Sequence, residues 1–393
     1  MKRHLSIVLT AFISLSSLFV HQVKGQGSLA RPAKEVFNDS LVTSKVQIKL
    51  GGQLKLNGIY DFNALQDSES FNIPSIPTGD NHNTSPRFSL GAKQSRLKMN
   101  IAYNSDKLGQ ISSYFEGDFF GTGNMTFRMR FFYLDIDHFR VGQAWSLFCD
   151  ENNWPDVIDF DGPPTGIWVR SAQVRYTKQL SDNSKIAFAI ESPQAEITAI
   201  PALDSTITET FQGFPDLTAH WNKSGDWGHV QLALVYRHLN YLKDNKTLSN
   251  DAGGASLSGH LNIRNNDKLR LQVTAGSGIG SYLVSFMGGG FDAVTSSKGR
   301  LSNIPVFGGY AAYELMLSKS LKSTFVYGYS HMSTDIDELP NDEFWGHYTS
   351  ANLFWLLDDK MTVGIEGLYG NVHDFNDATG HATRIQTMFL FNF

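Results

Sequence analysis

The chain has 393 residues, a mean hydropathy of −0.22 and a formal net charge of −5, values that on their own resemble those of a soluble protein. Its single cysteine, Cys149, excludes an intrachain disulfide framework, and its mild acidity argues against nucleic-acid binding. The 35 Gly, 28 Phe and 14 Tyr are instead typical of a chain rich in strands and tight turns.

The N-terminus has the layout of a secretory signal peptide over residues 1–25. Lys2 and Arg3 precede an apolar stretch, and a short polar segment leads to Gly25. We expect cleavage near Gly25, and the loss of two lysines and one arginine then takes the formal net charge from −5 to −8. A membrane anchor is the alternative, but the apolar stretch is short and interrupted by serine and threonine.

Residues 26–46 show weak patterning and are expected to be a periplasmic lead-in, whereas residues 47–393 alternate apolar and polar side chains at period two. This alternation is typical of β-strands. In the first strand, Leu54 and Leu56 share one face and Lys55 the other. A membrane barrel that alternates lipid-facing with lumen-facing residues would keep the low mean hydropathy noted above.

A later strand is expected to place Phe127, Met129, Phe131 and Tyr133 on one face and Arg128 and Arg130 on the other. Counted in this way the chain has about sixteen strands, an even number that suits single-chain bacterial barrels.

The lengths of the connections between these strands alternate between long and short. Long connections are expected near 63–87, 146–167, 193–214, 241–254, 282–304, 331–343 and 372–382, with a shorter member near 120–126. Short ones are expected near 104–109, 136–138, 179–184, 224–227, 265–267, 318–320 and 358–359. Outer-membrane barrels have short periplasmic turns and long outer loops. The pattern therefore predicts an all-β fold, a transmembrane antiparallel up-and-down β-barrel, in the outer membrane.

The last strand supports this fold, because Phe389, Phe391 and Phe393 share one face and Phe393 is the final residue. A terminal aromatic on such a strand is a recognition pattern of outer-membrane barrels. The alternative is the buried terminal strand of a soluble sheet.

If the apolar faces meet lipid, the opposite faces line a lumen, and their charges are the functional candidates. The expected pore-lining residues are Arg96, Lys98, Glu116, Asp118, Arg128, Arg130, Arg140 and Arg175. Arg264, Arg270, Glu191 and Glu366 are also expected to point inward. Rings of charge set pore selectivity, and the basic members suggest an anion preference. Equally, the arginines would pair with Glu116 and Asp118 and only stabilise the wall.

The segment 146–167 follows the fifth strand and is rich in acids. Its carboxylates are Asp150, Glu151, Asp156, Asp159 and Asp161. Folded inward, it would act as a constriction loop opposite the basic wall. Binding of a divalent cation and a solvated outer loop are the alternatives.

Motifs for catalysis or cofactor binding are not found. The sequence has no Gly-x-Ser-x-Gly, P-loop, His-Glu-x-x-His or Cys-x-x-Cys motif, and its twelve histidines lack metal spacing. We therefore expect no enzyme activity, no metal site and no cofactor.

Residues 88–192 resemble DcaP-like outer-membrane porins. The resemblance is carried by FSLGAKQSRLKMNI, YFEGDFFG, FRMRFFYLDI, FRVGQAWSLFCDENNWPDVIDFDGP and VRSAQVRYT. It implies a sixteen-stranded barrel that assembles as a homotrimer and admits small anions such as dicarboxylates. The matching basic residues, Arg96, Arg128, Arg130, Arg170 and Arg175, would line the pore. The acidic segment after Trp145 departs from the family pattern, and the N-terminal coiled coil of some members is not expected here.

The leading hypothesis is a non-enzymatic outer-membrane porin for passive diffusion of small polar solutes, with outer-membrane lipid as its surroundings. The first alternative is an outer-membrane barrel whose long outer loops carry an adhesive or enzymatic role. The second is a secreted β-sandwich that binds carbohydrate.

Overall fold

The computed structural model describes most of the chain after residue 40. The described residues are 41–43, 45–63, 65, 67–79, 85–121, 125–199, 211–243, 245–295, 300–334 and 343–393. The expected signal peptide, and all but the end of the expected lead-in, lie outside them.

One large antiparallel sheet makes up the molecule. Its wall strands are β2 (Val46–Asp61), β4 (Arg96–Ser105), β5 (Gly109–Asp118), β6 (Arg128–Ile136), β7 (Phe139–Trp145), β8 (Arg170–Ser181), β9 (Ser184–Glu191), β11 (Asp216–Gly225), β12 (Gly228–Lys243), β13 (Lys246–Asn262), β14 (Lys268–Ser277), β17 (Pro305–Met316), β18 (Leu321–Ser333), β19 (Glu343–Leu356), β20 (Met361–His373) and β21 (Thr379–Asn392). Two short strands, β1 (Leu41–Thr43) and β3 (Arg87–Gly91), pair with the two ends of β2.

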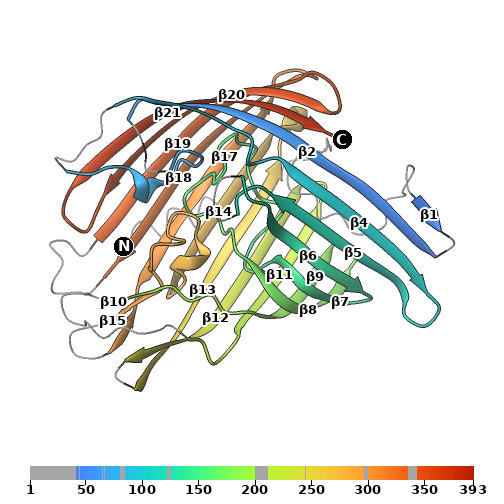
Figure 1. Cartoon of the computed structure of the whole chain (residues 1–393), viewed down its shortest axis with the longest axis horizontal. Coiled ribbons are helices and arrows are strands. Elements are labelled where there is room, and N and C mark those ends of the chain that lie inside the picture. Colours follow the sequence, from blue (N-terminus) through green and yellow to red (C-terminus); the bar gives the residue numbers. More distant parts are fainter. Residues whose placement is uncertain are drawn as a thin grey trace.

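The sheet closes on itself, because β2 pairs with β4 on one side and with β21 on the other. Among the described residues the wall is a closed barrel of 16 strands, as the alternation predicts. Figure 1 shows β2 and β21 running together along one edge of the view. Closure leaves no free sheet edge, which excludes the sandwich alternative.

The final residue takes part in closure. Phe393 and Gly52 exchange two backbone hydrogen bonds of 3.1 Å, and Phe389 and Phe393 are exposed on the outer face. The described residues also contain no helix long and apolar enough to cross a membrane.

The connections differ in length at the two ends of the barrel. At one end they cover only 106–108, 137–138, 182–183, 226–227, 263–267, 317–320 and 357–360. At the other they include 62–86, 119–127, 146–169, 192–215, 278–304 and 334–342. We call these the short-turn end and the long-loop end. The connection 374–378 at the long-loop end is no longer than 263–267, so the long connection expected near 372–382 is wrong. The long connection expected near 241–254 is wrong, because β12 extends to Lys243 and β13 begins at Lys246.

A β-bulge in β6 reverses part of the expected inside–outside pattern. Glu116 pairs with Phe131 while Gly117 pairs with Met129, so Arg130 is an extra residue in β6. Beyond the bulge, Phe131 faces inward at 7% exposure and Phe132 faces outward at 54%. The expectation that Phe131 and Tyr133 share a face with Phe127 is therefore wrong, since a bulge shifts the alternation by one residue.

Long connections fold back into the barrel and pack against one another. An apolar cluster joins residues of three long connections. Phe71 and Ile73 come from the first long connection (62–86), Phe148 from the third (146–169) and Phe286 from the sixth (278–304). The contact is close: a Cβ added to Gly346 of β19 would lie 2.3 Å from Ile73 Cγ2. A large part of the lumen at the long-loop end is therefore filled by chain.

Two smaller features complete the fold. Three 3-10 turns, η1 (Ile73–Ser75), η2 (Arg264–Asn266) and η3 (Gly280–Tyr282), lie between strands. A small sheet is formed by β10 (Ile197–Ala199), β15 (Ala293–Thr295) and β16 (Leu301–Asn303) at the long-loop end. Arg264 is exposed in η2, so its expected place on the lumen wall is wrong.

Candidate functional site

The third long connection, residues 146–169, lies inside the barrel, and we call it the inner loop. Leu147 and Phe148 at its start are buried, and the amide of Leu147 donates to Glu191 of β9 at 2.9 Å. Its far end pairs with the sixth connection through a β-bridge between Ile167 and Leu283. The inner loop is thus held at both ends and is not a solvated outer loop.

The first anchor of the inner loop along the wall is Asp150. Its carboxylate contacts His229 Nε2 of β12 at 3.0 Å and accepts a hydrogen bond of 2.6 Å from Ser258 of β13. Although burial alone would raise it, the pKa of Asp150 is lowered to about 2 by His229 and these hydrogen bonds. Asp150 is therefore an anion at neutral pH, and its charge is directed at the β12–β13 wall.

The middle of the inner loop is anchored to β14, β17 and β18. Asn153 accepts at its carbonyl from Tyr310 Oη (2.9 Å), and Arg270 donates to the carbonyl of Asn152 (2.7 Å). Arg270 is itself paired with Glu314 at 2.7 Å. Asp156 forms an ion pair with Lys322. The Asp156 carboxylate is thus neutralised on the side of the wall.

A third anchor joins the inner loop to β20. Glu366 accepts hydrogen bonds from the amides of Ile158 (2.9 Å) and Asp159 (2.8 Å). Asp159 in turn accepts from the amide of Phe71 at 2.9 Å. The middle of the inner loop therefore lies against the wall from β12 to β20, whereas Trp168 near its end packs on Trp145 of β7.

Asp161 is a pH-sensitive point in the contact between the inner loop and the first connection. Burial first, and then the neighbouring carboxylates of Asp159 and Asp67, raise its pKa from 3.8 to about 8. The folded state thus favours protonated Asp161, and the stability of the contact falls as pH rises from about 4 to about 8 and levels off above that.

We predict that backbone amides of residues 67–76 exchange about tenfold faster at pH 8 than at pH 6, after correction for intrinsic rates. Asp161→Asn should remove this difference, whereas Asp106→Asn in an exposed turn should retain it. Hydrogen exchange with mass spectrometry measures both. The same pH dependence in Asp161→Asn would assign it to another group.

Opposite the inner loop, a cleft remains along β4–β7, and we call it the basic cleft. Its lining comprises Arg96, Lys98, Tyr114, Glu116, Arg130, Phe131, Tyr133, Arg140, Ala144 and Trp145 of the wall, with Glu151 and Trp168 of the inner loop. Of the five inner-loop carboxylates considered above, only Glu151 lines it. Charge on this cleft therefore comes mainly from the wall.

Several cations of the basic cleft are paired. Arg130 contacts Glu116 at 2.8 Å and Asp118 at 2.9 Å, and Arg128 donates twice to Asp118, at 3.0 and 2.7 Å. Arg96 lies 3.5 Å from Glu116. The arrangement joins three arginines to two carboxylates, so the group keeps a net positive charge.

The remaining expected pore-lining residues lie on neighbouring strands. Arg140 donates twice to Asp135, at 2.7 and 2.9 Å, and lies 3.8 Å from the Tyr133 ring centre. Arg175 donates to Gln173 at 3.0 Å and to the carbonyl of Trp145. No ion pair of Arg175 is found among the described residues.

Arg170 was expected on the pore lining only from the family resemblance, and the structure places it among the arginines of the cleft. Its guanidinium lies 4.8 Å from the Trp145 ring centre and 5.9 Å from that of Trp168. Within the described part of the chain, it has no ion pair and its Nη1 atom is buried without a hydrogen-bond partner. Alternation alone puts Arg170 on the face opposite Arg175, but it is the first residue of β8, directly after the inner loop.

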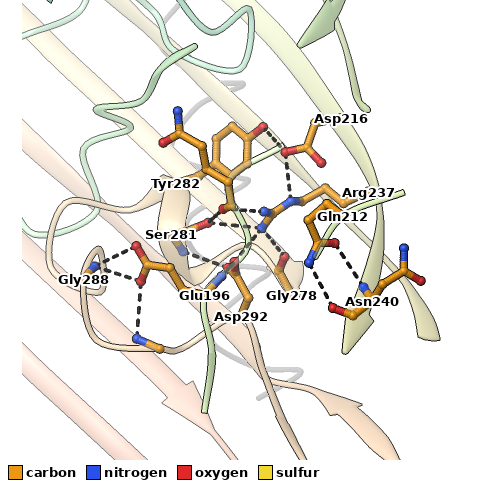
Figure 2. Close-up of polar contacts among 12 residues, drawn as sticks. Glu196, Gln212, Asp216, Arg237, Asn240, Gly278, Ser281, Tyr282, Gly288 and Asp292 are labelled. Carbon is orange, nitrogen blue, oxygen red and sulfur yellow. Dashed lines mark hydrogen bonds and ion pairs between the residues drawn. The ribbon is translucent and has the colours of Figure 1, made fainter. Parts of the chain in front are cut away.

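A second polar network holds the fourth (192–215) and sixth (278–304) long connections together, and Figure 2 shows it. Arg237 of β12 is fully buried and contacts Asp216 at 3.1 Å and Asp292 at 2.9 Å. Glu196 accepts from the amide of Gly288 at 2.8 Å. The network ties the loops that cover the β11–β14 side of the barrel.

We predict that Arg237→Met lowers the free energy of unfolding by about 3–5 kcal/mol, because two buried carboxylates lose their common partner. Urea unfolding of the refolded protein in detergent measures this. Lys223→Met, an exposed change on β11, is the control. Adding Asp216→Asn and Asp292→Asn to Arg237→Met should recover part of the loss, and no recovery would contradict the unpaired-charge explanation.

No group of three or more His, Cys, Asp or Glu that could hold a metal ion is found in the described ranges. Of the inner-loop acids, Asp150 and Asp156 contact the wall, and Asp159 accepts from the backbone of the first long connection.

Comparison with known proteins gives a family and a fold. A family model described as "DcaP outer membrane protein" matches residues 29–393. The crystal structure of the outer membrane channel DcaP of Acinetobacter baumannii is similar at 17% identity, with a TM-score of 0.75, over 90% of this chain and 99% of that one. No protein of curated function matches.

Two further solved structures share the fold. The anion-selective porin from Comamonas acidovorans is 12% identical with a TM-score of 0.58, over 89% of this chain and 100% of that one. OmpT of Vibrio cholerae in its trimer form is 10% identical with a TM-score of 0.56, over 89% and 100% of the two chains.

Proposed function

Because this chain belongs to the DcaP outer membrane protein family, we propose that it is a passive porin whose basic cleft admits small polar anions. It is an outer-membrane β-barrel, and its short-turn end is then periplasmic. The observation that carries the anion preference is the direction of the inner-loop acids. Asp150, Asp156 and Asp159 contact the opposite wall or other loop backbone, so they do not offset the arginines of the cleft.

The solutes we propose are small dicarboxylates, as the family resemblance implies. Arg170 has a guanidinium nitrogen, Nη1, without a hydrogen-bond partner in the described part of the protein, and Arg130 and Arg96 line the adjacent cleft. Guanidinium groups bind carboxylates through paired hydrogen bonds, so two such groups suit a solute with two carboxylates. Passage needs no catalytic group.

We further propose that the protein is a homotrimer that associates through the β6–β9 face. β6, β7 and β9 have 9, 7 and 8 residues, at or below the ~9–11 residues that a tilted strand needs to cross the bilayer. Their outward side chains are apolar, and Val141, Val174, Ile190 and Phe214 line a shallow groove. A neighbouring copy would cover this face better than a full-thickness bilayer.

Single-channel recording in planar bilayers under a KCl gradient tests the proposal. Stable steps in groups of three with an anion-selective reversal potential are expected. Arg170→Gln should lower the anion/cation permeability ratio by about threefold, and Arg170→Lys should keep it. A cation-selective reversal potential would overturn the anion preference, and a folded barrel without conductance would favour the adhesive or enzymatic alternative.

A further inference from the structure

A belt of histidine and aromatic side chains covers the outer face of four adjacent strands, β18–β21, at the long-loop end. We call this group the histidine belt, and its members are His331, His347, His373, His381, Tyr327, Tyr329, Trp345 and Tyr369. The strand register places His331 beside Trp345 and Trp345 beside His373. In the next row His347 lies beside Tyr329 and Asn371, and Asn371 beside His381.

The belt faces away from the lumen. Ser330 and Met332, on either side of His331, are buried inside the barrel, and so are Gly346 and Tyr348 beside His347. Because successive strand residues point to opposite faces, the histidines point to the outside.

The members of the belt contact one another across the strands. The Trp345 and His373 rings are stacked with centroids 5.3 Å apart, and Tyr329 and His347 are 5.0 Å apart. Tyr327 Oη is 2.7 Å from His347 Nδ1. The imidazoles thus form one continuous surface.

The charge of this surface depends on pH. Among the residues that the structure describes, its acidic neighbours are Glu343, 3.8 Å from His331, and Asp377, 2.9 Å from His373, with Asp374 in the same connection as Asp377. With neutral imidazoles the belt region is negative. Histidine is the side chain whose charge changes in mildly acidic medium, so protonation of the imidazoles would offset the carboxylates that the structure describes beside them.

The position of the histidine belt along the barrel indicates which part of the lipid it contacts. Toward the short-turn end the same strands expose Phe325, Leu353, Ile365 and Ile385, which form an apolar surface for acyl chains. Aromatic side chains mark the level at which such a surface meets the lipid headgroups. β18–β21 have 13 or 14 residues, enough to span the bilayer, in contrast to the short strands β6, β7 and β9.

We propose that the histidine belt binds phosphate-bearing headgroups of the outer-leaflet lipid, and that this binding tightens in mildly acidic medium. The proposal requires the outer-membrane location but is independent of what the pore conducts. Imidazolium groups interleaved with tyrosine hydroxyls supply charge and hydrogen-bond donors to a phosphate diester, while the rings lie at the interface.

The test uses the full chain refolded in phosphatidylcholine vesicles with spin-labelled phosphatidylglycerol or phosphatidylcholine. The measured quantity is the ratio of the two lipid-association constants, because the phosphatidylglycerol charge is constant over this pH range. For the wild type we expect the ratio to rise about fivefold from pH 7.5 to pH 5.5. Replacing all four belt histidines by glutamine should abolish the rise, and His347→Gln alone should reduce it.

The control variant is His138→Gln with His238→Gln, which changes two histidines outside the belt and should keep the full rise. Heat-modifiable migration shows that each variant is a folded barrel. A pH-independent ratio in the wild type, or an equal rise in the fourfold variant, would overturn the proposal. Loss of the difference on adding millimolar inorganic phosphate would show a phosphate site without lipid selectivity and would overturn the lipid assignment.

Discussion

Replacing Arg128 and Arg130 together by alanine is expected to lower the anion/cation permeability ratio by about tenfold and to make the pore cation-selective. The reason is that Glu116 and Asp118 remain. In the wild type these carboxylates are held by the two arginines at 2.7–2.9 Å, and in the variant Asp118 loses both arginines while Glu116 keeps only Arg96, 3.5 Å away. Reversal potentials under a KCl gradient give the ratio.

The matched control adds Glu116→Gln and Asp118→Asn to the same variant. If uncompensated carboxylates cause the inversion, this fourfold variant should return toward anion preference, because Arg96 and Arg170 are still present. A permeability ratio that stays at the wild-type value in the Arg128/Arg130 variant would remove these residues from the selectivity mechanism. They would then serve only to stabilise the wall.

The barrel itself could be predicted from the sequence, because lipid imposes a repeating constraint on every strand. Leu54 and Leu56 face outward and Lys55 faces inward, as alternation requires. The sequence does not predict the part of the β12–β13 hairpin that extends beyond the membrane. There Leu239, Tyr241 and Ala252 pack against the small sheet rather than lipid, so the residues near 241–254 carry no outward apolar pattern.

The candidate site was only partly predictable. The period-two alternation of the sequence correctly places Arg96 and Arg130 on the inner wall. The inward direction of Phe131 and Tyr133 depends on a bulge in the pairing of β5 with β6, which the sequence does not reveal. The inner-loop acids were identified as residues, yet the direction of their side chains depends on partners 79 to 166 positions away in the chain, such as His229 and Lys322. Such long-range contacts leave no local pattern.

Replacing residues 150–162 of the inner loop by a short glycine–serine linker is expected to raise single-channel conductance roughly threefold or more. This segment carries the contacts to β12, β13, β14, β18 and β20, and without it the space beside the basic cleft opens. A barrel of this strand number encloses a wide aqueous channel when no loop fills it. Conductance in symmetric KCl measures the change.

The ion selectivity of the linker variant shows whether the channel has only widened or whether the basic cleft has also lost its structure. The ion pairs of Arg128 and Arg130 involve only β5 and β6, so the variant should keep its anion preference, although weakened by the larger cross-section. Asp150→Asn, which weakens one anchor, should leave the mean conductance near the wild-type value and increase current fluctuations. An unchanged conductance in the linker variant would mean that current passes elsewhere than beside the inner loop, and the basic cleft would then not be the constriction.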